Sequence, residues 1–166
     1  MTDAKPDNVL VAYPEHEDCK IGHSAVQTFY DYCRSIKPVA DLADRVHFDP
    51  FKLRPWLGYI MILDDLPDVN DFLYRMYGTQ IARQSGFDLT GRRVSESQSP
   101  LNTFFRHLYR DCVARKSLIY SEHTRVLERT DCAWYRLLCP VQADGNTQVV
   151  VCNYPVARQR PLSDDI

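Results

Sequence analysis

Residues Asp71–Arg92 read DFLYRMYGTQIARQSGFDLTGR, and the organisation of the whole chain follows from this stretch. Its first part, Asp71–Tyr77, is rich in aromatic and apolar side chains and predicts a β-strand. Gly78 permits a tight turn, and Thr79 is suited to cap a short helix. That helix is expected to end at Gly86, because glycine readily takes the left-handed conformation of a helix end. Such a strand, turn and helix form a compact wall that can border a small cavity.

The composition indicates one ordinary globular domain. The chain has 166 residues, of which 45% are hydrophobic and 25% charged, enough to bury a core. A formal net charge of -2 lacks the basic footprint of nucleic-acid binding, so no nucleic-acid partner is expected. No apolar run is long enough for membrane insertion. The N-terminal residues MTDAKPDNVL do not resemble a secretory signal, so we expect a cytoplasmic protein.

No motif for metal binding or catalysis is present. The cysteines form no CxxC pair and no zinc-finger spacing with histidine, so we interpret them as buried, reduced thiols. A redox-sensing thiol is the alternative, because thiol reactivity depends on the surroundings. The chain has no HExxH motif, phosphate-binding loop or suggestive Ser/His/Asp order, so we predict neither catalytic nor metal-binding residues. The cysteines are Cys19, Cys33, Cys112, Cys132, Cys139 and Cys152.

The N-terminal part predicts an arm followed by a helix. Met1–Lys20 is irregular and is expected to be mobile or to dock on another surface. Gly22–Lys37 predicts an amphipathic helix with Ser24 as its N-cap. Such a helix either covers the core of its own domain or pairs with a second copy. Its apolar stripe consists of Val26, Phe29, Tyr30 and Cys33.

The central part predicts a hairpin and a long helix. Gly58–Leu63 is the best candidate for a central strand, and Asp64–Asp68 has the composition of a turn. The strand Asp71–Tyr77 would complete this hairpin. Pro100–Lys116 predicts the longest helix, since apolar residues recur in it at helical spacing. That apolar face comprises Leu101, Phe104, Phe105, Leu108 and Cys112.

Strands are also expected at Ser117–Glu128, Ala133–Val141 and Thr147–Val156. Asp144-Gly145 is a strong signal for a two-residue hairpin loop between the last two. This loop places Tyr135, Leu137 and Cys139 opposite Tyr154, Cys152 and Val150 on one apolar face. The other face carries Arg136, Asn153, Trp134 and Leu138.

These elements predict an α+β domain with about five antiparallel strands and helices packed on one face. An N-terminal helical extension precedes it. We expect residues 1–39 to form the arm and amphipathic helix, residues 40–157 the domain, and residues 158–166 a polar tail.

The order of elements resembles the PAS domain superfamily, in which a hairpin, short helices and a longer helix precede a three-stranded meander. Within it the chain is most similar to a bacterial family of small stand-alone PAS-like proteins. The most distinctive match is YR-x-x-GT followed by G-x-DLTG, and the resemblance covers most of 40–155. The reactive cysteine motif of flavin photosensors is missing. The matching residues are Asp44-Arg45, Phe48-Asp49-Pro50, Leu53, Leu57-Gly58, Tyr74-Arg75, Gly78-Thr79, Gly86 and Asp88-Leu89-Thr90-Gly91-Arg92.

The resemblance implies a cavity between the sheet and the small helices, without specifying a ligand or cofactor. Its candidate lining is largely apolar, as is usual for small-molecule pockets. The alternative is that the same side chains simply fill the core. The candidates are Tyr74, Arg75, Met76, Ile81, Phe105, Tyr135 and Leu137, to which His107 on the long helix is added as a possible haem ligand.

Arg75 lies in an otherwise apolar strand, so it must reach solvent or be paired. Pairing with Asp88 or Asp71 would give it a structural role. In the functional alternative, Arg75 binds a carboxylate or phosphate group of a ligand.

We therefore expect a non-catalytic sensory or regulatory module that binds a small ligand, a partner protein in signal transduction, or both. A homodimer is the expected assembly. One alternative is a ligand-free adaptor for protein interactions. Another is a haem-binding or enzymatic domain that uses His107.

Overall fold

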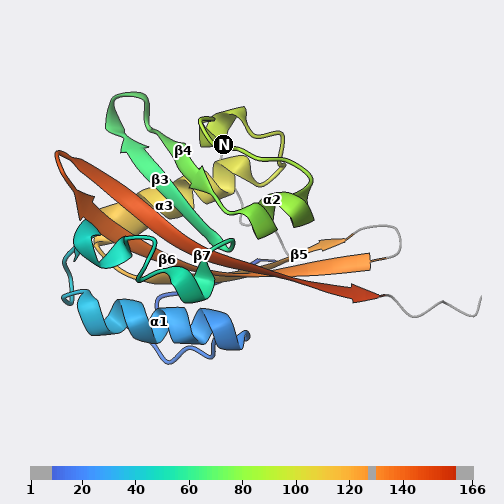
Figure 1. Cartoon of the computed structure of the whole chain (residues 1–166), viewed down its shortest axis with the longest axis horizontal. Coiled ribbons are helices and arrows are strands. Elements are labelled where there is room, and N and C mark those ends of the chain that lie inside the picture. The colour runs from blue at the N-terminus through green and yellow to red at the C-terminus, as the bar shows by residue number, and fades with distance from the viewer. Residues whose placement is uncertain (1–8, 127–129, 160–166) are drawn as a thin grey trace, which may run out of the picture.

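The computed structural model describes residues 9–126 and 130–159 of the chain. Its strands form one sheet in the order β1-β5-β6-β7-β3-β4, with antiparallel neighbours, and β2 pairs in parallel with β6 (Figure 1). The strands are β1 (Val9–Ala12), β2 (Ala43–Asp44), β3 (Ile60–Leu66), β4 (Asp71–Tyr77), β5 (Ile119–Val126), β6 (Thr130–Ala143) and β7 (Asn146–Gln159). The helices are α1 (Ser24–Ile36), α2 (Thr79–Ser85) and α3 (Asn102–Arg115), with 3-10 turns η1 (Arg45–Phe48), η2 (Arg54–Trp56), η3 (Pro67–Val69) and η4 (Val94–Glu96).

This architecture confirms the predicted α+β fold with an antiparallel sheet. The N-terminal segment adds a strand, because β1 pairs antiparallel with β5, from Val9 opposite His123 to Ala12 opposite Tyr120. The expected arm therefore docks on the sheet edge from residue 9 onward. Its residues 1–8 lie outside the described part of the chain, as do residues 160–166 of the expected tail.

Helices cover both faces of the sheet (Figure 1). On one face, α1 buries the predicted stripe Val26, Phe29, Tyr30 and Cys33 against the residues of β6 and β7 that point toward this helix. On the opposite face α2 and α3 pack over a second core. Of the two alternatives for the first helix, the structure shows the one in which it covers the core of its own domain. The helices that were expected on one face of the sheet correspond to α2 and α3. The expected N-terminal helical extension is α1, which covers the other face.

The β6–β7 hairpin confirms the register expected from the Asp144-Gly145 loop. Leu137 lies opposite Cys152, and Cys139 lies opposite Val150. Because side chains alternate along a strand, neighbouring residues of β6 face different cores. Leu137 therefore faces α1, whereas Arg136 faces α3.

The expected turn Asp64–Asp68 was wrong at its first residues. Strand β3 continues through Asp64 and Asp65 to Leu66, and the chain turns at η3. Both aspartates are buried, but Asp64 pairs with Arg75 and Asp65 pairs with Arg110. Acidic residues can lie within a buried strand when a cation compensates the lost hydration, so their turn-like composition was misleading.

Two predicted helix caps are displaced by one residue. His23 caps α1, since its Nδ1 accepts a hydrogen bond from the Ala25 amide at 3.2 Å, in place of Ser24. Gly78 precedes α2, so Thr79 is the first helical residue. A Cβ atom at Gly78 would lie 2.3 Å from the carbonyl oxygen of Gly58, so this close backbone approach requires glycine. The other expected end, Gly86, is confirmed with a φ of 88°.

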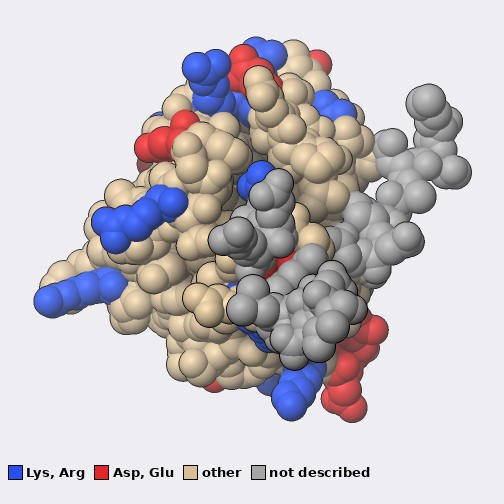
Figure 2. All heavy atoms as spheres, turned by 90° about the vertical axis from the view of Figure 1, so that its right-hand side faces the viewer, with Lys and Arg blue, Asp and Glu red and all other residues tan. Residues whose placement is uncertain are grey.

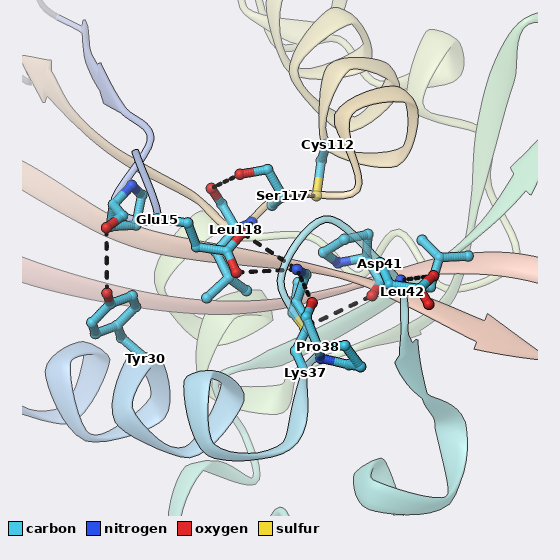
Figure 3. Close-up of polar contacts among 12 residues, drawn as sticks. Glu15, Tyr30, Lys37, Pro38, Asp41, Leu42, Cys112, Ser117 and Leu118 are labelled. Atoms are coloured by element: carbon cyan, nitrogen blue, oxygen red, sulfur yellow. Dashed lines mark hydrogen bonds and ion pairs between the residues drawn. The ribbon is translucent and has the colours of Figure 1, made fainter. Parts of the chain in front are cut away.

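A buried ion pair fastens α1 to the N-terminal segment (Figure 3). Lys37 Nζ lies 3.1 Å from Glu15 Oε1 and also donates to the Pro38 carbonyl at 2.9 Å. Glu15 Oε2 in turn accepts the backbone N–H of Leu118 at 2.9 Å. The Lys37 side chain is fully buried and that of Glu15 is 8% exposed. This arrangement joins the end of α1, the segment after β1 and the start of β5.

We expect Lys37→Met to lower the free energy of unfolding by about 3–5 kcal/mol, because it leaves the Glu15 carboxylate buried without its cation. Urea denaturation measures the change. Lys52→Met is the matched control, since Lys52 pairs with Asp49 at the exposed surface, and it should change the free energy by less than about 1 kcal/mol. Equal effects of the two substitutions would contradict the role given to the buried pair.

Candidate functional site

A cavity of about 580 Å³ lies between the inner face of the sheet and the segments that carry α2, η4 and the start of α3. Its volume falls in the range of small-molecule pockets, and its walls are mainly aromatic and aliphatic. The apolar lining comprises Tyr74, Tyr77, Ile81, Phe87, Leu89, Val94, Pro100, Leu101, Phe105, Val126 and Trp134. The polar lining comprises Ser85, Ser97, Gln98, Ser99, Asn102, His123, Thr124, Arg125, Arg136 and Asn153.

The stretch that follows α2 forms one wall of the cavity because it is fastened to the edge strand β4. The Gly91 amide donates to the Tyr74 carbonyl at 2.7 Å, and the Tyr74 amide donates to the Arg92 carbonyl at 2.9 Å. Asp88 stabilises the turn that follows it by accepting hydrogen bonds from the amide and hydroxyl of Thr90. The sequence DLTGR therefore holds Leu89 against the second core.

Arg136 is the charged group inside the cavity. It lies in the middle of β6 and is only 7% exposed. Its Nε donates to Asn153 Oδ1 at 3.2 Å, and its Cζ lies 3.7 Å from the centre of the Phe105 ring. Its Nη1 is buried and has no hydrogen-bond partner among the described residues. Among the described residues, the cavity lining contains no aspartate or glutamate, so none of them neutralises this guanidinium.

His123 lies beside Arg136 on the neighbouring strand β5. Its ring is nearly parallel to that of Trp134, with the centres 6.3 Å apart, and its buried Nδ1 has no partner among the described residues. Burial, and secondly the charge of Arg136, lower the pKa of His123 to about 3. The imidazole is therefore neutral near pH 7.

The phenols around the cavity are neutral as well. Burial raises the pKa of Tyr74 well above its ordinary value and also raises the pKa values of Tyr77 and Tyr109. The charged side chains among the described lining residues are thus both positive, namely Arg136 inside the cavity and the exposed Arg125. Figure 2 shows a different character on the outer surface, where basic and acidic side chains are interspersed on the face drawn.

The structure places three of the predicted site residues in the cavity wall, namely Tyr74, Ile81 and Phe105. Tyr135 and Leu137 belong to the opposite core under α1. Met76 also packs against that core. His107 is exposed on α3 and does not line the cavity, so its position does not suit the alternative in which it is a haem ligand.

Arg75 has the structural role that was one of its two alternatives, but with a different partner. Its Nη2 and Nε lie 2.5 and 3.1 Å from the two carboxylate oxygens of Asp64, and it does not line the cavity. The expected partners were wrong, because Asp71 accepts hydrogen bonds from Ser95 and Asp88 caps its own turn. Asp64 was assigned to the predicted turn, but it lies in β3 opposite Leu73 of β4, two residues from Arg75.

The cysteines are free, and all except Cys19 are buried, which confirms their interpretation as buried thiols. Burial raises the pKa values of Cys33, Cys112 and Cys152 well above the ordinary value, which disfavours the reactive thiolate. Within residues 9–126 and 130–159, no group of three or more His, Cys, Asp or Glu residues is arranged to hold a metal ion.

The sequence-based site list missed Arg136, His123, Asn153 and Trp134. The signal that could have found them was already available. The hairpin register placed Arg136 and Asn153 together on the face opposite Leu137, and a charged side chain between buried strands requires an explanation.

A protein-family comparison matches residues 21–152 to a PAS domain model. The chain belongs to the PAS domain family. Neither the curated proteins nor the solved structures compared with it include a match. Among the helices of the described residues, none has the length and apolar character needed to cross a bilayer. The boundaries at residues 39 and 157 stay predictions.

The depressed pKa of His123 predicts a pH dependence of stability. In the unfolded chain its pKa is near 6.5, so between that value and about 3 the unfolded state binds more protons. The free energy of unfolding therefore falls as the pH falls, and this histidine contributes about 2 kcal/mol of that loss between pH 7 and pH 5.

We expect His123→Asn to lose about 2 kcal/mol less than the wild type over this interval, as measured by urea denaturation at both pH values. The exposed His16 gives the matched control, and His16→Asn should keep the wild-type loss. A wild-type loss in His123→Asn would show that His123 is not held neutral by the fold.

Proposed function

We propose that this PAS domain is a non-catalytic sensory module that binds a small molecule in the cavity between the sheet and α3. Membership of the PAS family indicates a sensory or regulatory module. The observation that supports ligand binding is the 580 Å³ cavity, in which buried polar atoms of Arg136 and His123 have no partner among the described residues. Buried polar groups are normally hydrogen-bonded, so unpaired ones indicate a missing interaction.

The chemistry of the cavity supports binding rather than catalysis. His123 is the imidazole within it, and a pKa near 3 makes it a weak base at neutral pH. Catalytic proton transfer is most efficient when the pKa lies near the working pH. The ligand-free adaptor is less well supported, since a core filled by its own side chains would leave no cavity of this size.

The sheet offers a physical route from the cavity to the opposite face. Arg136 faces the cavity, whereas its chain neighbours Tyr135 and Leu137 pack in the core beneath α1. A ligand that shifts β6 therefore acts on the packing of α1 as well. The shift in the equilibrium between the ligand-free and ligand-bound packing of β6 and α1 is limited by the difference in ligand affinity between these two conformations.

We propose that the output reaches a signalling partner or a second copy through α1 and the segment that follows it. This segment exposes several large apolar side chains to solvent, among them Phe51, which is 82% exposed. Apolar residues gathered on a surface are typical of protein contacts. The others in this segment are Val39, Val46 and Leu57.

Filling the cavity should abolish ligand binding. Leu89 lines the cavity from the loop after α2 and is partly buried, so Leu89→Trp adds volume there without replacing a fully buried core residue. We expect the wild type to retain or acquire a bound small molecule from a metabolite extract, seen as added mass in native mass spectrometry. Leu89→Trp should show at least about tenfold less of that adduct, because overlap with the ligand costs more than 1.4 kcal/mol.

Val69→Trp is the matched control. Val69 is 52% exposed in η3 and does not line the cavity, so the larger side chain should leave the adduct unchanged. Absence of an adduct from the wild type across extracts, or an equal adduct on Leu89→Trp, would contradict ligand binding in this cavity.

A further inference from the structure

We propose that the ligand is an organic acid whose carboxylate pairs with Arg136 and whose apolar body occupies the rest of the cavity. This inference rests on the proposed function and specifies the class of ligand. It depends on the charge balance of the cavity, on the surroundings of the guanidinium and on the apolar character of the walls.

The surroundings of Arg136 differ from those of three arginines that are paired with a carboxylate. Arg75, Arg110 and Arg115 each contact a carboxylate, at distances between 2.5 and 2.8 Å, and each is more exposed than Arg136. Arg136 is the most deeply buried of these four, and among the described residues its side chain contacts the Asn153 amide oxygen and the Phe105 ring. A buried cation is unfavourable unless an anion accompanies it, so an acidic group from outside the chain would complete the site.

The guanidinium is held in place before any ligand arrives. Asn153 accepts from Nε on one side, and the Phe105 ring lies against the guanidinium plane at 3.7 Å. These contacts restrict its rotamers and occupy only one of its five N–H donors. Binding an acceptor therefore requires little further ordering of Arg136, which favours affinity.

The neighbouring polar groups do not compete for an anion with negative charge of their own. The facing groups are the neutral imidazole of His123, the neutral phenols of Tyr74 and Tyr109, and the Ser121 hydroxyl, which lies opposite Arg136 on β5. The Ser121 hydroxyl is buried and, like Arg136 Nη1, has no partner among the described residues. These groups can donate hydrogen bonds but add no repulsion.

A carboxylate suits this site better than a phosphate. One guanidinium presents two parallel donors that match the two oxygens of a carboxylate. A phosphate monoester carries about two negative charges and is normally bound by several cations or by a helix N-terminus together with a glycine-rich loop. The described lining residues include no lysine, and the second arginine among them, Arg125, is exposed.

The walls indicate an apolar body for the ligand. Trp134, Phe105 and Ile81 are almost fully buried and line the cavity. Burial of apolar surface against such walls supplies about 25 cal/mol for each Å² removed from water. A small hydrophilic acid would gain little there, whereas an acid with an aromatic or aliphatic body uses both parts of the site.

The test compares head groups on one body. The probes are 3-phenylpropanoate, octanoate and indole-3-acetate, each with its primary amide, and 2-phenylethylphosphonate as the phosphorus analogue of the first. Isothermal titration calorimetry with the whole chain at pH 7.5 gives the dissociation constants. We expect at least one carboxylate to bind at least about tenfold more tightly than its amide and than the phosphonate, as a charge-assisted pair predicts.

Variants assign the preference to Arg136. Arg136→Met should remove at least about tenfold of the carboxylate affinity and leave the amide affinity unchanged. It should leave the melting temperature of the ligand-free protein unchanged or raise it, because an unpaired buried charge is replaced by an apolar side chain. Arg110→Met is the matched control, since Arg110 pairs with Asp65 and lies over the Phe72 ring. It should lower the melting temperature and preserve the carboxylate affinity.

The inference would be overturned if every amide bound as tightly as its carboxylate, if the phosphonate bound more tightly, or if no carboxylate bound at millimolar concentration. It would also be overturned if Arg136→Met kept the head-group preference or unfolded the ligand-free protein, since a structural arginine would behave in that way. None of these outcomes contradicts the proposed function if the wild type still acquires an adduct from the metabolite extract and Leu89→Trp removes it. If the wild type acquires no adduct, or Leu89→Trp keeps it, the proposed function itself is contradicted.

Discussion

The central constraint on this domain is that β6 and β7 are buried on both faces. Neither strand can be stable in water with only one layer of helices, because apolar side chains alternate onto two sides of the sheet. The helix α1 supplies the layer on one side, and α2, η4 and α3 supply the layer on the other (Figure 1). The remaining elements can be understood as the connections and contacts that hold these two layers against the hairpin.

The same constraint explains the position of the site. Arg136 lies in the middle of β6 and is only 7% exposed, so its charge must be compensated largely where it lies. The protein provides Asn153 and Phe105 as neighbours and leaves a cavity of about 580 Å³ beside them. Buried charges elsewhere in the fold, such as Lys37 and Asp64, are paired with an opposite charge from the same chain. This contrast between compensated and uncompensated charges is the reason for proposing a ligand at Arg136.

The two layers are also physically coupled. Side chains alternate along β6, so adjacent residues of this strand pack in different cores. This alternation is the basis for the proposed route from the cavity to α1. The C-terminal end of α1 is fixed through Lys37 and Glu15 to the start of β5 (Figure 3). β5 carries His123 in the cavity wall. The α1 layer is thus connected to the cavity through the neighbouring strands β5 and β6.

Local sequence patterns determined much of this protein. Helical spacing located α1 and α3, the Asp144-Gly145 loop fixed the register of the last hairpin, and YR-x-x-GT with DLTG indicated the PAS fold. These features depend on residues near one another in the chain. Only the tertiary structure decided which face of the hairpin met the cavity, because either face could have been covered by either helical layer. It also decided that Asp64, and neither Asp71 nor Asp88, pairs with Arg75, and that Arg136 has no carboxylate partner among the described residues, because the pairing of buried charges depends on distances between strands.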